Sequence, residues 1–231
     1  MNPQIRAHDT GLKYPPAHAE HSHVDDTHVD DTPSPAPHGD ARIGPNALTR
    51  VAEVLCAQFG PARAVEIFSD AGLLHRVHEA PQDMVPQSEV TRLHGVLRRA
   101  FGEEQARAIG REAGARTADY LLANRIPRVV QALLRTQPSR IAARGLSAAI
   151  SRNAWTFAGS GRFTAHPGRP TVLSVAGCPI CRDAVSDAPL CDYYAGTFER
   201  LFCGIVDRRM RVVETACEAR GDPACVFEIR W

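Results

Sequence analysis

Three cysteines between residues 189 and 231 have the type and placement of metal ligands. Cys191 falls in the first turn of a helix expected to start at Pro189, where the helix dipole favours a thiolate. Cys217 and Cys225 flank a turn at residues 221–223, so a two-stranded hairpin would place them opposite each other on one face. Three such thiols suit Zn²⁺, which takes four tetrahedral sulfur, nitrogen or oxygen ligands.

The fourth ligand is not decided by these residues alone. Glu214 lies three positions before Cys217, and an odd separation along a regular strand points two side chains to opposite faces. A β-bulge or a strand end near Thr215 would be needed to turn the carboxylate toward the thiols.

A helix and a hairpin must position this group. Strands are predicted from Met210 to Thr215 and from Cys225 to Ile229, where β-branched residues are frequent or the turn returns the chain. A helix over residues 189–206 is predicted from apolar residues at helical spacing on one face: Leu190, Tyr194, Phe198, Leu201, Phe202 and Ile205.

Residues 45–151 show helical patterns. Apolar stripes predict helices that start at Pro61 and after an N-cap at Ser88. Alanine-rich helices, broken at prolines, follow over residues 103–124 and 127–151. Short strands are then expected at Trp155–Phe157, Arg162–Thr164 and Val172–Val175. Helices first and strands later indicate an α+β fold, with the helical part packed on a small antiparallel sheet.

Three stretches resemble a known domain family, the 4-vinyl-reductase domain. They are CDYYAG from Cys191, VETAC from Val213 and GDPACVF from Gly221, and the resemblance covers about residues 150–231. The family occurs in bacteriochlorophyll biosynthesis proteins, archaeal predicted hydrocarbon-binding proteins and sensor modules of aromatic-responsive regulators.

Zinc-containing members of that family carry their ligands at the spacing C-x22-E-x2-C-x7-C. Cys191, Glu214, Cys217 and Cys225 reproduce this spacing, so the resemblance implies that they hold a structural Zn²⁺. The ion would clamp the C-terminal helix to the hairpin. The expected division of the chain is a disordered His-, Asp- and Pro-rich tail (1–44), a helical region (45–151) and a 4-vinyl-reductase-like α+β domain (152–231).

The whole chain resembles the vinyl-reductase proteins of bacteriochlorophyll biosynthesis. This resemblance implies a pocket for divinyl protochlorophyllide or a related magnesium tetrapyrrole, as ligand or substrate in 8-vinyl (formerly 4-vinyl) reduction. Its walls would include Tyr120, Leu121, Trp155 and Phe157. The axial imidazole for magnesium would come from His75, His78 or His94, although the plainer interpretation of each is a surface or capping histidine.

Motifs for a hydride donor are missing from the sequence. No G-x-G-x-x-G follows a predicted strand, no Walker-type loop occurs, and the single lysine is Lys13. We therefore expect a substrate-binding or carrier component that promotes vinyl reduction, with no catalytic residue assigned. Partner enzymes of the pathway and a homodimer are also expected. The alternatives are a self-sufficient vinyl reductase and a sensor of small hydrophobic ligands.

The pair Cys178–Cys181 forms a CxxC motif with three interpretations. Structural thiols or a loop beside the ligand pocket are favoured over half of a zinc site or a redox pair, because no second CxxC and no βαβ pattern accompany it.

Composition limits the partners and the location. A net charge of +1 gives no electrostatic basis for binding nucleic acid, and no apolar run is long enough to span a membrane. Seven cysteines without a secretory signal predict reduced thiols and a cytoplasmic protein, peripheral to the photosynthetic membrane.

Overall fold

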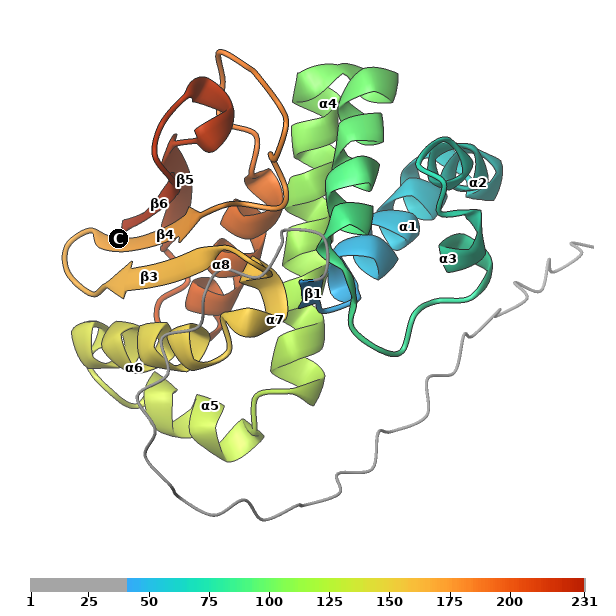
Figure 1. Ribbon diagram of the computed structural model, residues 1–231. Helices are drawn as coiled ribbons and strands as arrows, with labels where there is room; N and C mark the ends of the chain where they lie inside the picture. The colour runs from blue at the N-terminus through green and yellow to red at the C-terminus, as the bar shows by residue number, and fades with distance from the viewer. Residues whose placement is uncertain (1–40, 231) are drawn as a thin grey trace, which may run out of the picture. The chain divides into compact units, whose positions relative to one another are not determined.

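The computed structural model describes residues 41–230, and its longer strands form an antiparallel sheet on which helices pack (Figure 1). A separate ladder pairs β1 (Arg42–Ile43) with β2 (Val85–Pro86). The expected α+β class is confirmed. Of the predicted tail, residues 1–40 lie outside the described residues, and β1 occupies part of the remainder. The sheet has the order β3-β4-β6-β5: β3 (Arg162–His166), β4 (Thr171–Ala176), β6 (Cys225–Arg230) and β5 (Arg211–Ala216).

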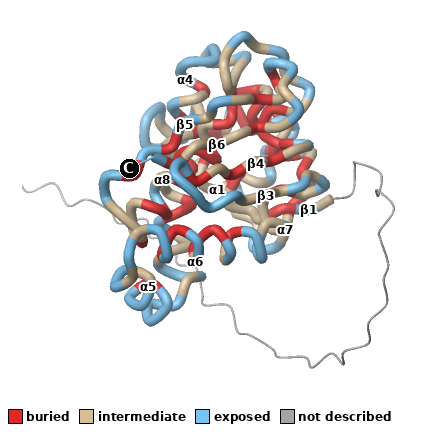
Figure 2. The backbone as a smooth tube through the Cα atoms, turned by 90° about the vertical axis from the view of Figure 1, so that its left-hand side faces the viewer, coloured by how far each residue is buried: buried red, intermediate tan, exposed pale blue. Residues whose placement is uncertain are grey.

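The two central strands bury one face of the sheet. Leu173 and Val175 of β4 alternate with less buried residues, and Cys225, Phe227 and Ile229 of β6 do the same. This alternation is the period of two that a half-buried strand shows. Figure 2 shows the buried positions following these strands. The hairpin of β5 and β6 is confirmed, and so are strands close to the predicted positions in β3 and β4.

The first part of the described chain is helical, as predicted. Gly60 ends the first helix with a φ of 85°, and Pro61 opens the second at its first helical position. Prolines also precede the later helices of this part, because proline fixes φ and tolerates the first turn. These helices are α1 (Asn46–Phe59), α2 (Pro61–Asp70), α3 (Leu74–His78), α4 (Gln87–Asn124), α5 (Arg128–Arg135) and α6 (Ser139–Arg152).

Two predictions in the helical part are wrong. Ser88 is not an N-cap, because α4 already begins at Gln87 after Pro86, whose ψ of 131° ends the extended chain there. The predicted strand Trp155–Phe157 is instead a short helix, α7 (Trp155–Ala158). Its backbone turns because the amides of Phe157 and Ala158 both donate to the carbonyl of Ala154, which leaves none for a sheet neighbour.

Helix α8 (Asp192–Ile205) lies between α4 and the sheet (Figure 1). It starts at Asp192, later than Pro189, so Cys191 occupies the N-cap position. The predicted apolar face is buried in full. Toward the sheet, Phe198 packs on Phe163 of β3 and Phe227 of β6, with ring centroids 6.2 and 5.4 Å apart.

Glycines let α8 approach α4 closely. A Cβ atom on Gly114 of α4 would lie 2.0 Å from the carbonyl oxygen of Tyr193, and one on Gly196 of α8 would lie 2.2 Å from that of Arg111. Small residues were predicted either to bring helices together or to leave room for a ligand, and at this crossing they bring helices together. Since α4 and α8 lie on the two sides of the predicted boundary at residue 151, the two parts share one interior.

Among the described residues, no helix combines the length and the apolar character needed to cross a membrane.

Candidate metal centre

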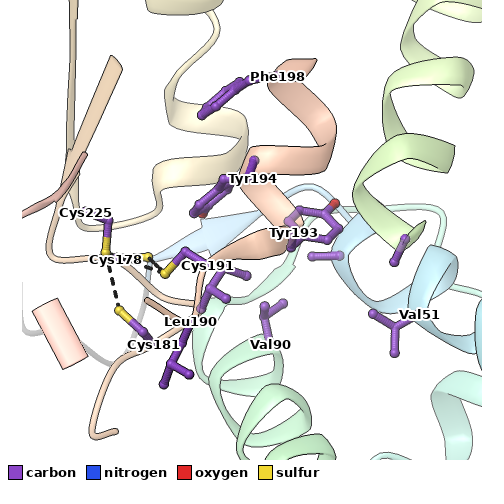
Figure 3. Close-up of a cluster of buried hydrophobic side chains, with 14 of the residues drawn as sticks. Val51, Val90, Cys178, Cys181, Leu190, Cys191, Tyr193, Tyr194, Phe198 and Cys225 are labelled. Carbon is purple, nitrogen blue, oxygen red and sulfur yellow. Dashed lines mark hydrogen bonds between the residues drawn. The ribbon is translucent and has the colours of Figure 1, made fainter. Parts of the chain in front are cut away.

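Five buried cysteines bring their sulfur atoms together where α8 begins and the β5–β6 hairpin turns. We call this group the thiol cluster: Cys178, Cys181, Cys191, Cys217 and Cys225. Figure 3 shows four of the side chains directed toward one another, from the loop after β4, the N-cap of α8 and the start of β6. No disulfide is formed among the described cysteines. The cluster therefore presents unoxidised sulfur ligands from segments far apart in the sequence.

The three cysteines predicted as zinc ligands have the spacing that a metal requires. Sulfur atoms of Cys191 and Cys225 are 3.5 Å apart, those of Cys191 and Cys217 are 4.0 Å apart, and those of Cys217 and Cys225 are 3.9 Å apart. Tetrahedral Zn–S bonds of about 2.3 Å place two ligating sulfur atoms roughly 3.8 Å from each other. The separations fit one zinc ion at the centre of the three thiols.

Glu214 joins these thiols because of a β-bulge. The register of β5 on β6 shifts between Glu214 and Ala216, which leaves Thr215 as the extra residue and turns the carboxylate to the side of Cys217. This is the bulge that the spacing required. One carboxylate oxygen of Glu214, Oε2, accepts a hydrogen bond from the backbone amide of Cys191 at 2.7 Å. The other, Oε1, is buried and has no partner among the described residues.

Electrostatics at the site call for a cation. Burial raises the pKa of Glu214 to about 9, and the neighbouring Cys217 contributes to the increase. Burial also raises the pKa of the Cys191 thiol, which outweighs the lowering expected from the helix dipole. A bound divalent cation reverses both effects, because it favours the anionic forms of its ligands. The unpartnered Oε1 atom and the three thiols thus form a donor set that fits Zn²⁺.

The CxxC pair lies inside the same cluster, not beside a ligand pocket. Sulfur atoms of Cys178 and Cys191 are 3.5 Å apart, and those of Cys181 and Cys225 are also 3.5 Å apart. The carboxylate of Glu218 fixes this loop by accepting the amides of Gly177 and Cys178, at 2.5 and 2.7 Å. The interpretation as half of a zinc site, which the sequence left open, describes this placement best.

Comparisons with known proteins identify the family. The model of the 4-vinyl reductase domain matches residues 171–231. The chain is 45% identical over 188 residues to the bacteriochlorophyll synthase 23 kDa chain of Cereibacter sphaeroides, and the alignment covers 81% of this chain and 90% of that one. This chain belongs to that family. The resemblance to the 4-vinyl-reductase domain is thereby confirmed. The 23 kDa chain of Rhodobacter capsulatus is 37% identical over 195 residues, covering 84% of this chain and 90% of its own length.

The fold of this family member is also found among solved structures. A structure from work on haem distortion in the H-NOX family superposes with a TM-score of 0.53. It is 14% identical, and the match covers 82% of this chain and 95% of that one. At this level of identity the likeness is one of fold.

The four predicted pocket residues do not line either cavity that the structure forms near the thiol cluster. Tyr120 lies under the guanidinium of Arg50, which is 4.8 Å from its ring centroid. Leu121 packs partly against the core, and Trp155 is 63% exposed on α7. Phe157 packs edge-on against Phe163, Tyr194 and Phe198.

The three predicted axial histidines of this family member differ in burial. His75 and His78 are exposed on α3. His94 of α4 is buried, and its Nε2 atom has no hydrogen-bond partner among the described residues. Burial lowers its pKa to about 3, so the imidazole is neutral and its unprotonated nitrogen is a free ligand. A cavity of about 10 Å³, room for one water molecule, lies against it.

An open groove adjoins this cavity across Arg98 and Leu190, which line both. The groove has a volume of about 470 Å³ and lies between α4 and the loop that carries the CxxC motif. Sequence reasoning did not find this groove, because its residues come from segments with no common motif. Four arginines line it, and we call it the arginine groove: Arg92, Arg98, Arg99 and Arg182.

Proposed function

We propose that this protein acts in bacteriochlorophyll biosynthesis by binding a tetrapyrrole of the divinyl protochlorophyllide type and promoting reduction of its 8-vinyl group. The observation that carries the proposal is the 45% identity, over most of both chains, to a bacteriochlorophyll synthase 23 kDa chain. The shared fold with a protein of the H-NOX family, whose haem is another tetrapyrrole, supports the choice of ligand class. In this role the protein is a substrate-binding or carrier component that works with enzymes of the pathway.

His94 is the candidate axial ligand for the magnesium ion of the pigment. It alone of the three candidate histidines is buried, and a neutral imidazole nitrogen without a partner binds a metal readily. The cavity beside it holds one water molecule, so a macrocycle would enter only after the wall of Arg98 and Leu190 moves toward the groove.

The arginine groove suits the carboxylate of the pigment. None of its four arginines forms an ion pair within the described residues; Arg92, Arg98 and Arg182 donate to uncharged oxygen atoms instead. Three acidic residues also line the groove (Asp70, Glu103 and Asp183), which leaves it with a small positive excess. Guanidinium groups bind carboxylates through two parallel hydrogen bonds, so a free propionate is an apt partner.

The metal in this proposal is structural. Cys191, Glu214, Cys217 and Cys225 supply four ligands to one Zn²⁺, and a closed set of four leaves no position for a reacting water. The ion would fix the start of α8, which follows Leu190 at the wall of the groove, to the hairpin.

A spectral titration tests the ligand. Purified full-length protein is mixed with divinyl protochlorophyllide, and with the monovinyl form, while the absorption bands of the pigment are followed. We expect saturable shifts that the variant His94→Gln weakens at least tenfold, whereas the matched variant His78→Gln leaves them unchanged. Saturable binding that is equal in both variants would remove His94 from the role, and an absence of shifts would overturn the proposal.

A turnover assay distinguishes the carrier from a reductase. The protein is incubated with divinyl protochlorophyllide and NADPH in the absence of other proteins, and the products are separated by chromatography. A carrier gives no monovinyl product until a partner reductase is added. Monovinyl product from the protein alone would establish the alternative of a self-sufficient vinyl reductase.

The location proposed for this role is the cytoplasmic surface of the photosynthetic membrane. On α5, Val129 is 79% and Leu133 is 61% exposed, with Arg128 and Arg135 at the ends of the same helix. Apolar side chains flanked by cations are the composition of a surface that rests on anionic lipid. The wild type should sediment with phosphatidylglycerol vesicles, and the double variant Val129→Asp, Leu133→Asp should not; equal sedimentation would contradict this location.

A further inference from the structure

The thiol cluster contains two complete sets of four metal ligands. One set is Cys178, Cys181, Cys191 and Cys225, and the other is Cys191, Glu214, Cys217 and Cys225. Within each set, the ligating atoms all lie within 4.8 Å of one another. The two sets share Cys191 and Cys225 only. Each set alone would satisfy the tetrahedral coordination of zinc.

The shared pair has the separation of two bridging thiolates. The sulfur atoms of Cys191 and Cys225 are 3.5 Å apart. If each bridges two zinc ions with bonds of about 2.3 Å, the two ions lie roughly 3 Å from each other on opposite sides of the sulfur–sulfur line. The terminal ligands lie on the matching sides, because Cys178 and Cys181 belong to one set, and Glu214 and Cys217 to the other.

A single zinc would leave part of this arrangement without a role. With one ion in the Cys/Glu set, Cys178 and Cys181 remain as buried thiols, each 3.5 Å from a metal-bound sulfur atom. Buried cysteines are ordinarily enclosed by apolar side chains, whereas here each faces other sulfur ligands. The loop that carries them is also held in place, by Glu218 at Cys178 and by Arg98, which donates to the carbonyl of Ile180 at 3.1 Å.

Charges beside the cluster match two ions. Five thiolates and one carboxylate around two divalent ions leave a residual negative charge, and the guanidinium of Arg98 lies beside the CxxC loop to offset part of it. The bridging residues are buried completely, so neither ion would be open to water. Such a centre is closed and structural.

We propose that the thiol cluster binds two zinc ions, bridged by Cys191 and Cys225, with Cys178 and Cys181 as terminal ligands of one ion and Glu214 and Cys217 as terminal ligands of the other. This centre does not depend on the tetrapyrrole, and its test is a count of metal ions. It adds a second ion to the single structural zinc proposed above.

Metal stoichiometry provides the first test. Full-length protein is produced in zinc-supplemented medium, freed of loose metal by gel filtration, and analysed for zinc, iron and acid-labile sulfide against quantitative amino-acid analysis. We expect two zinc ions per wild-type chain and one in the double variant Cys178→Ser, Cys181→Ser. The matched double variant Cys56→Ser, Cys203→Ser, which changes the two cysteines outside the cluster, should keep two.

The outcomes separate this inference from the single structural zinc. One zinc ion in the wild type, unchanged in the Cys178 and Cys181 double variant, would overturn the second ion and leave the first in place. No metal would overturn both, and iron with acid-labile sulfide would replace the zinc centre by an iron–sulfur cluster. Because the double variant could misfold, X-ray absorption at the zinc edge of the wild type gives an independent readout: a zinc–zinc distance of about 3 Å is expected, and its absence contradicts the bridge.

Discussion

At the scale of single residues, Thr215 decides whether a carboxylate can join the thiols. It is the extra residue of the β-bulge, and without it Glu214 and Cys217 would lie on opposite faces of β5. The site therefore depends on a residue that contributes no ligand.

Cys217 should contribute far more to stability than Cys203. Replacing Cys217 by Ser removes a soft ligand from the metal and leaves a hydroxyl in a buried site, so we expect the free energy of unfolding to fall by more than about 3 kcal/mol. Cys203 lies outside the thiol cluster and is half-buried on α8, so its replacement by Ser should cost less than about 1 kcal/mol. Urea denaturation followed by circular dichroism measures both; equal losses would contradict a metal ligand at position 217.

His94 should make stability depend on pH. Burial holds its pKa at about 3, against 6.5 in the unfolded chain, so below pH 6.5 the unfolded chain binds a proton that the folded protein does not. The contribution is complete above pH 6.5 and is lost as the pH falls toward 3. At pH 5 the loss is about 2 kcal/mol. The variant His94→Phe should lose this component of the pH dependence between pH 7 and pH 5, and an unchanged slope would show that His94 is not buried and neutral.

At the scale of elements, the crossing of α4 and α8 holds the start of α8 beside the hairpin. The closest approach is at Gly114, and ion pairs support it: Arg111 of α4 contacts Asp192 at 3.2 Å and Glu199 at 2.9 Å, both on α8. These pairs are partly exposed, so their stabilisation is screened by solvent. The close backbone packing is the larger contribution.

Gly114→Ala should disrupt this crossing. Its Cβ would lie 2.0 Å from the backbone oxygen of Tyr193, which cannot move without shifting α8, so we expect a loss of roughly 3 kcal/mol. Gly95→Ala on the same helix is the matched control, because its nearest neighbour is the flexible end of Arg99, 3.4 Å away. The control should be neutral or more stable by up to about 1 kcal/mol. Thermal unfolding compares the two; similar midpoints would contradict the close crossing.

Elements with a long periodic pattern could be predicted from the sequence, and short ones could not. The apolar face of α8 and the hairpin followed from spacing over many residues. Trp155–Phe157 has strand-forming residues but too few to show a period, and local hydrogen bonds to Ala154 made it helical. Ser88 has the chemistry of an N-cap, but the proline before Gln87 had already started α4.

At the scale of the whole molecule, the thiol cluster joins segments that the sequence keeps apart. The loop after β4, the start of α8 and both strands of the hairpin each supply at least one ligand. The spacing of Cys191, Glu214, Cys217 and Cys225 could be read from the sequence because the family motif contains it. The approach of the CxxC loop could not, since it depends on the pairing of β4 with β6.

Metal removal should loosen these segments selectively. After treatment of the protein with a strong chelator, we expect faster amide hydrogen exchange in residues 177–191 and 211–230, because the ion links them. Peptides from α1 supply the internal control, since α1 contributes no ligand. Mass spectrometry resolves the two regions, and equal acceleration in both would indicate global unfolding without a local clamp.

The ligand site could be predicted only as a class of ligand. His94 was one of three candidates, and its burial depends on the packing of α4 against Tyr193 of α8, whose ring centroid is 6.0 Å away. The arginine groove combines side chains from α4 and the CxxC loop, so no linear motif marks it.

The bulge in β5 has a second effect, on how copies of the protein meet. Strand β5 is an edge of the sheet, and a regular edge strand offers unpaired backbone groups to another chain. Here the bulge interrupts that row at Thr215, while Glu199 and Arg111 already bind the amide and carbonyl of Val212. The feature that directs Glu214 inward thus also protects this border of the sheet against strand-to-strand aggregation.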